Sequence, residues 1–141
     1  MHDGGARGPG AAFAYAWLLA TLLSGIPSTT YALLTGNDPL EATRAAGAMI
    51  GRPDSIAAAA LVHCAVSLFW VVALWLWLPR GMAWALLASA AIALLDLKVL
   101  APLFFPAVAA LDFWPQLADH LAWGAFYSVG LSLARPRATR P

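Results

Sequence analysis

Four ionisable side chains with the chemistry to bind a ligand interrupt otherwise apolar stretches of this chain: His63, Asp96, Asp119 and His120. Imidazoles and carboxylates exchange protons and bind cations. An ionisable group inside a membrane costs about 2.5–3.5 kcal/mol on insertion scales, so it normally faces the interior of a helix bundle and finds partners there. We therefore predict that these residues line a binding site for a proton, an ion or a small solute. The alternative is a structural role, in which they only hydrogen-bond neighbouring helices.

The spacing of these residues does not indicate a metal or a cofactor. Two imidazoles and a carboxylate suit zinc or iron, and His63, His120 and Asp96 are the only set that the residue types suggest. No HxxxH, HExxH or Glu-x-x-His pair falls on one helix, however, so we expect no metal, no haem and no other cofactor. Ser67 lies one turn from His63, but nothing around it resembles a nucleophile elbow. Cys64, the only cysteine, cannot form an internal disulfide and is interpreted as a small packing residue.

The elements that position these residues are four apolar runs. The 141-residue chain is 62% hydrophobic and 11% charged, with a mean hydropathy of +0.74, whereas soluble domains carry about 25% charged residues. We predict an all-α polytopic membrane protein forming a single domain, residues 1–141, surrounded by a lipid bilayer. The net charge of +1 is too small to attract nucleic acid, so we expect no nucleic-acid partner. The predicted spans are residues 11–26, 56–78, 82–101 and 117–134.

The first run also has features of a secretory signal peptide, because it is short and follows His2 and Arg7. No clean small-x-small cleavage site precedes Gly25-Ile26-Pro27. Cleavage would leave three spans, with the two ends on opposite sides. We therefore expect the run to be retained as a span.

Basic residues near the span ends predict the orientation. With four spans, both termini and the turn at 79–81 share one side, and basic residues favour the cytoplasm. We therefore expect cytoplasmic termini. That side carries Arg7, Arg80, Arg135, Arg137 and Arg140, and the other carries Arg44, Arg52 and Lys98.

Tryptophans near the span ends support these boundaries, because indole rings favour the headgroup level. Trp17 and Trp70 lie deeper and are interpreted as packing residues. The interfacial group comprises Trp75, Trp77 and Trp84 at the inner turn and Trp114 and Trp123 at the outer start of the last span.

The connection after the first span is predicted to be helical. Ser28 is placed to cap a short helix over 29–35, which Gly36 ends. The segment Asp38-Pro39-Leu40-Glu41 is typical of a helix start, and the second helix is expected over 39–50.

That second helix is a candidate lid over the bundle. Arg44 is spaced to pair with Glu41, three residues earlier. If the helix instead folds over the bundle mouth, Arg44 faces Asp96 or Asp119. Arg44 and Ser28 therefore join the candidate ligand-binding residues. The other outer connection, 102–114, is apolar but broken by prolines, which predicts a bent segment packed against protein.

Small and polar residues recur on one stripe of each later span, and these stripes are predicted to face inward. Small residues let helices approach closely in a membrane. The stripes are His63, Ser67, Trp70 and Leu74; Ala85, Ser89, Ala93 and Asp96; and His120, Gly124, Tyr127 and Leu131.

Three segments taken together, residues 24–29, 35–47 and 115–124, carry a resemblance. They read Ser-Gly-Ile-Pro-Ser-Thr, Thr-Gly-Asn-Asp-Pro-Leu-Glu-Ala-Thr-Arg-Ala-Ala-Gly, and Pro-Gln-Leu-Ala-Asp-His followed by Trp-Gly. In this combination the chain resembles a group of small, uncharacterised bacterial four-span integral membrane proteins, over about residues 18–131. The resemblance implies a bacterial inner-membrane location and carries no activity or site residues with it.

Three functions fit the sequence. The first is a small integral membrane protein that binds or passes a proton, ion or small solute in an outward-facing polar pocket. The second is an accessory subunit that packs against a partner membrane protein or a second copy of itself. The third, less favoured, is a metal-dependent membrane enzyme.

Overall fold

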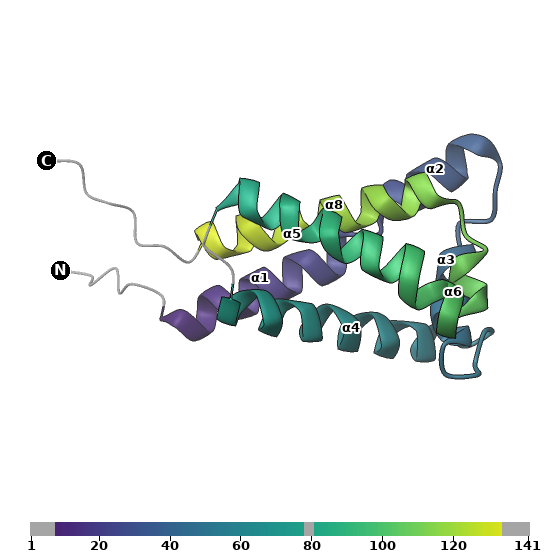
Figure 1. Ribbon diagram of the computed structural model, residues 1–141, viewed down its shortest axis with the longest axis horizontal. Helices are drawn as coiled ribbons and strands as arrows, with labels where there is room; N and C mark the ends of the chain where they lie inside the picture. Colours follow the sequence, from purple (N-terminus) through teal and green to yellow (C-terminus); the bar gives the residue numbers. More distant parts are fainter. Residues whose placement is uncertain (1–7, 78–80, 134–141) are drawn as a thin grey trace, which may run out of the picture.

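The computed structural model describes residues 8–77 and 81–133, and this part of the chain is helical with no strand. At one end of the bundle lie the start of α1, the end of α4, the start of α5 and the end of α8; α2, α3 and α6 lie at the other (Figure 1). The helices are α1 (Pro9–Leu23), α2 (Ile26–Thr35), α3 (Glu41–Ala48), α4 (Ile56–Trp77), α5 (Met82–Leu95), α6 (Ala101–Phe104), α7 (Pro106–Ala109) and α8 (Phe113–Leu133), with a π-helical segment η1 (Asp96–Leu100) between α5 and α6.

Three helical segments are long and apolar enough to cross a membrane: Pro9–Thr35, Ile56–Trp77 and Met82–Phe104. The fourth long helix, α8, has 21 residues but is less apolar and is not among them. Large apolar side chains remain exposed on the outer faces, including Leu61 (65%) and Leu87 (63%), which suits lipid better than water. The all-α prediction is confirmed for the described residues, and the chain is a small helical membrane protein.

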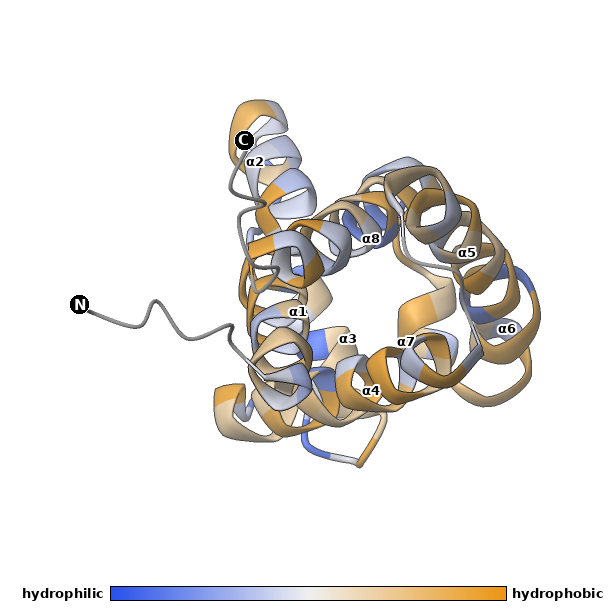
Figure 2. Ribbon diagram, turned by 90° about the vertical axis from the view of Figure 1, so that its left-hand side faces the viewer, coloured by the Kyte–Doolittle hydropathy of each residue, from blue (hydrophilic) through white to orange (hydrophobic). Residues whose placement is uncertain are grey.

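Helix α8 is the main packing partner in the bundle. It packs against α1 and α5, and α4 packs against the other side of α1. Viewed along the bundle, the order is therefore α4, α1, α8, α5 (Figure 2). The two predicted stripes on α5 and α8 do face inward: Ala85, Ser89 and Ala93 are buried, as are Gly124, Tyr127 and Leu131.

Two glycines of α8 permit its close contacts. A Cβ atom at Gly130 would lie 2.5 Å from the Cα atom of Ala16 on α1. One at Gly124 would lie 2.7 Å from the main-chain oxygen of Ala85 on α5. Backbones can approach this closely only where a side chain is absent, as is common between membrane helices.

The first helical segment is interrupted between α1 and α2, at Ser24 and Gly25. Pro27 lies in the first turn of α2, where its missing N–H is not needed. The predicted Ser28 cap is wrong, because α2 begins at Ile26 and Ser28 is already inside it. Gly36 ends α2 with a φ of 74°, the left-handed conformation expected of a terminating glycine.

Helix α3 is shorter than the predicted 39–50, because Pro39 and Leu40 form a turn before it and residues 49–51 form another after it. Asp38 still organises the start, since its Oδ1 accepts the N–H of Leu40 at 2.8 Å. At the same end of the bundle, helix α8 begins at Phe113, two residues before Pro115. The basic residues Arg7, Arg80, Arg135, Arg137 and Arg140 lie outside the described residues.

The close contact at Gly130 gives a first prediction. Substituting Gly130→Ala should destabilise the bundle by about 1–3 kcal/mol, because the new methyl group meets backbone that cannot move aside. Thermal unfolding in detergent would measure the effect. The control is Gly10→Ala on α1, where a Cβ meets nothing within 4 Å. Equal stability of the two variants would show that α1 and α8 are not in close contact.

Candidate functional site

The interruption between α1 and α2 is held by side chains from two other helices. The Nε2 atom of His63, on α4, lies 2.8 Å from the carbonyl oxygen of Thr21. The N–H of Ser28 donates to Oδ1 of Asp119, on α8, at 2.8 Å. Backbone groups at helix ends have no partner in the helix itself, and in a membrane water does not supply one. His63 and Asp119 therefore stabilise the break in the first helical segment.

The contact with Thr21 determines which tautomer of His63 is present. A carbonyl oxygen can only accept, so the hydrogen must be on Nε2 of the imidazole. In the neutral ring, Nδ1 is then a hydrogen-bond acceptor. His63 thus holds α1 through one nitrogen and keeps an acceptor on the other.

A second hydrogen-bonded group lies in the centre of the bundle. The hydroxyl groups of Thr21 and Ser67 are 2.7 Å apart, and the indole N–H of Trp123 donates to Oγ of Ser67 at 2.9 Å. All three residues are buried. This group joins α1, α4 and α8 at one point.

The interfacial assignment of Trp123 is therefore wrong, because only 8% of it is exposed. Trp123 stacks on Tyr127, one turn later, with ring centroids 5.7 Å apart. Tyr127 lies on the predicted inward stripe of α8, so the i, i+4 spacing was the signal that Trp123 faces the core. By contrast, Trp77 (86%) and Trp114 (75%) are exposed, and Trp70 packs against the core as predicted.

Asp96 and His120 are brought together, as predicted, but without His63. The Oδ2 atom of Asp96 lies 3.4 Å from Nε2 of His120. The Nδ1 atom of His120 donates to the main-chain oxygen of Gln116 at 2.8 Å. Because Nδ1 already carries a hydrogen, a hydrogen bond between Oδ2 and Nε2 requires one further proton, on either the carboxyl group or the imidazole. Lys98 has a different contact, 4.1 Å from the ring centroid of Phe113.

Asp96 begins the π-helical segment η1. Such segments are rare and occur frequently at functional sites. Even so, no group of three or more His, Cys, Asp or Glu side chains that could hold a metal ion occurs among residues 8–77 and 81–133. The set of His63, His120 and Asp96 therefore does not assemble as a metal site.

A cavity of about 480 Å³ lies under α3, between this helix and the interruption of the first segment. We call it the lid cavity. Ala42, Thr43 and Ala46 of α3 form its roof, and His63 and Asp119 contribute its ionisable groups. Ser28, Gln116 and Cys64 also line it, whereas Asp96 and His120 do not. Of the predicted site residues, the structure thus brings His63, Asp119 and Ser28 to one cavity.

Arg44 does not face into the lid cavity. It pairs with Asp38 on an exposed surface, instead of with Glu41, Asp96 or Asp119. The prediction that the α3 segment covers the bundle mouth agrees with the cavity lining, but Arg44 takes no part in it.

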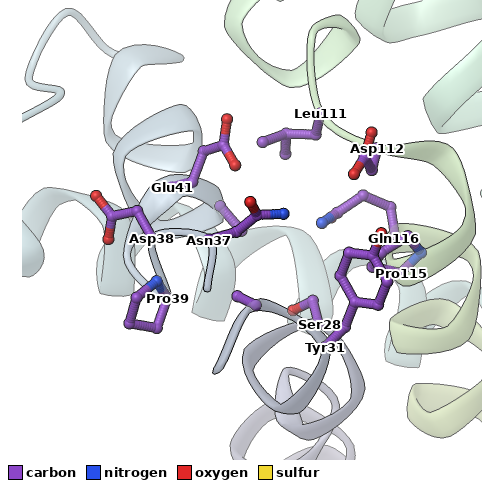
Figure 3. A pocket seen from close by; sticks show the side chains of 12 residues that line it. Ser28, Tyr31, Asn37, Asp38, Pro39, Glu41, Leu111, Asp112, Pro115 and Gln116 are labelled. Atoms are coloured by element: carbon purple, nitrogen blue, oxygen red, sulfur yellow. The ribbon is translucent and has the colours of Figure 1, made fainter. Parts of the chain in front are cut away.

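A smaller pocket of about 30 Å³ adjoins the lid cavity and shares Ser28, Pro39, Ala42, Leu111 and Gln116 with it. We call it the outer pocket. The side chains of Asn37 and Gln116 point toward one another across it, and Glu41 and Asp112 stand on either side (Figure 3). Asp38 lines it as well. Gln116 and Asn37 were not predicted, since a single amide has no sequence signature.

Comparison with protein-family models, with curated proteins and with solved structures gave no match. The interpretation of the site therefore stands on its geometry. Two groups are distinct in that geometry: the lid cavity with His63 and Asp119, and the Asp96–His120 pair beside it. Gln116 links them, because its main chain binds His120 and it also lines the cavity.

The central hydroxyl of Ser67 gives a second prediction. Ser67→Ala should lower the free energy of unfolding by about 1–2 kcal/mol, because it leaves both Thr21 and the indole N–H of Trp123 without their partner. Thermal unfolding in detergent measures this. Ser132→Ala is the control, since its exposed hydroxyl bonds only the carbonyl of Val129 within its own helix. A Ser67 variant as stable as this control would contradict the assigned hydrogen bonds.

A third prediction separates the hydrogen bond of Asp119 from its charge. Asp119→Ala should cost about 1 kcal/mol, the scale of a lost helix cap, because the N–H of Ser28 loses its acceptor. Asp119→Asn keeps an oxygen in the same place and should unfold close to wild type. Equal losses in both variants would show that the carboxylate charge, and not the hydrogen bond, holds α2.

Proposed function

We propose that the chain is a four-span protein of a bacterial inner membrane, with both ends in the cytoplasm, that binds a small solute in the lid cavity on the outer side. Helix α8 is the fourth span, since its 21 residues lie alongside α1 and α5. The end of the bundle away from α3 adjoins the basic segments of the sequence, which favours the cytoplasm for that end. The resemblance to small bacterial four-span proteins supports the same location.

The lid cavity is the observation that carries this proposal. Its volume of about 480 Å³ is within the range of small-molecule sites, roughly 300–1,000 Å³. Such sites combine mostly apolar walls with a few polar groups that fix orientation. The lid cavity has this composition, with His63, Asp119 and Gln116 among alanine, leucine and valine side chains. Ionisable groups at membrane depth are costly, so their presence on a cavity favours a binding role.

We extend the proposal to proton exchange at the Asp96–His120 pair. A proton between these two side chains is held next to the cavity, because the His120 ring binds the main chain of Gln116, which lines it. Gain or loss of that proton changes the charge next to the bound solute. Solute binding and proton exchange would then be coupled through the first turns of α8.

A fourth prediction uses Cys64, the only cysteine, as a reporter of the cavity. A membrane-impermeant thiol reagent added outside intact cells should modify it. Ala60→Phe, which fills the cavity wall, should slow the reaction several-fold. Ala57→Phe is the matched control, because Ala57 is exposed on the same helix but does not line the cavity.

Two results would contradict the proposal. Modification only from the cytoplasmic side would overturn the orientation. No modification of the purified protein would show that the cavity is closed to solutes.

A further inference from the structure

The lining of the lid cavity selects a class of ligand by charge. Among the described residues that line it, Asp119 is the only Asp, Glu, Lys or Arg. Arg44, the basic residue of α3, is paired with Asp38 outside the cavity. An anionic solute would therefore lose its hydration without meeting a fixed positive charge, which is costly. A cation would meet a carboxylate.

The hydrogen-bonding groups favour a ligand that donates. His63 uses Nε2–H for the Thr21 carbonyl, and its Nδ1 remains an acceptor in the neutral ring. Oδ1 of Asp119 accepts the main-chain N–H of Ser28, and a carboxylate can accept about four hydrogen bonds in all. A primary ammonium group has three donors and no acceptor. It complements these two side chains more fully than a hydroxyl or a carboxylate does.

The outer pocket adds negative charge at the boundary of the cavity. Glu41 and Asp112 line it together with Asp38, whose charge is paired with Arg44, and no Lys or Arg among the described residues lines either pocket. The two pockets share five lining residues, so they are adjacent. Carboxylates grouped beside a low-dielectric cleft raise the local concentration of cations.

The rest of the lining fits an apolar body. Leu22 (71% exposed) and Ile56 (67% exposed) line the cavity and also reach its outside. In a membrane these exposed side chains meet lipid, so the cavity opens beside the acyl chains as well as beneath α3. A ligand with one polar end and one apolar end can enter by this route.

We propose that the lid cavity binds an amphipathic primary amine, with its ammonium group on Asp119 and His63 and its apolar body against Leu22, Ile56 and Ala59. This assignment rests on the proposed solute site. The same chemistry occurs in a free amine and in the ethanolamine headgroup of a phospholipid, and the test distinguishes these sources.

The first measurement compares two thiol reagents of similar size on Cys64, in bilayer discs of phosphatidylcholine. One is the cationic aminoethyl methanethiosulfonate and the other the anionic sulfonatoethyl compound, each normalised to its rate with free cysteine. We expect the cation to be favoured by about tenfold or more. Asp119→Asn, which keeps the oxygen bonded to Ser28, should abolish most of this preference. Thr43→Lys, which adds an ammonium group to the roof, is a second variant with the same expected loss.

The second measurement is protection of Cys64 by ligands that share one apolar body. We expect 2-phenylethylamine to slow modification of the wild type, and 2-phenylethanol and 3-phenylpropionate to have little effect. The protection should disappear in Asp119→Asn. The same experiment in discs that contain phosphatidylethanolamine distinguishes a lipid ligand from a free amine. Slower modification of Cys64 in these discs identifies the lipid headgroup as a ligand. An unchanged rate identifies a free amine.

The outcomes separate the two proposals. Equal rates for both reagents, or equal protection by 2-phenylethanol, would overturn the proposal of an amine ligand. The lid cavity would then be a site for neutral solutes. Faster reaction of the anionic reagent would overturn it as well. If Cys64 of the purified wild type reacts with neither reagent, the open cavity and the proposed function both fail.

Discussion

A helix that breaks within a membrane must find partners for its backbone in neighbouring helices, and this constraint organises the rest of the structure. The break between α1 and α2 places the Thr21 carbonyl beside His63 of α4 and the Ser28 N–H beside Asp119 of α8. These two hydrogen bonds fix the axial positions of α4 and α8 relative to α1 and α2. The lid cavity lies at the same break, because Thr21, Gly25 and Ser28 line it together with the two side chains.

The helices α1, α5 and α8 pack closely along the bundle, whereas space remains at the end that α3 covers. Helix α8 meets α1 at Gly130 and α5 at Gly124, where only a missing side chain allows the backbones to approach. Ser67 joins α4 to the same unit through Thr21 and Trp123. With the spanning helices held in this way, the short helix α3 covers the remaining space instead of filling it.

Two polar residues at this end combine a structural contact with further hydrogen-bonding capacity. His63 and Asp119 each satisfy a backbone group with one atom and keep acceptor capacity for the cavity. Their structural role and the proposed binding role are therefore compatible. Loss of the side chain removes both, whereas Asp119→Asn retains the first role and removes the charge required for the second.

The sequence by itself determined the helical, membrane-embedded class, the end of α2 at Gly36, and the inward stripes of α5 and α8, since each depends on local composition and spacing. It also grouped Asp96 with His63 and His120, of which His120 is the one that Asp96 contacts. Only the tertiary structure decided that His63 binds Thr21, that Asp119 holds α2, that Trp123 is buried and that Arg44 turns to Asp38. These contacts depend on the rotation and axial position of one helix against another. A shift of one turn, about 5.4 Å, exchanges one partner for the next without any change in the sequence pattern.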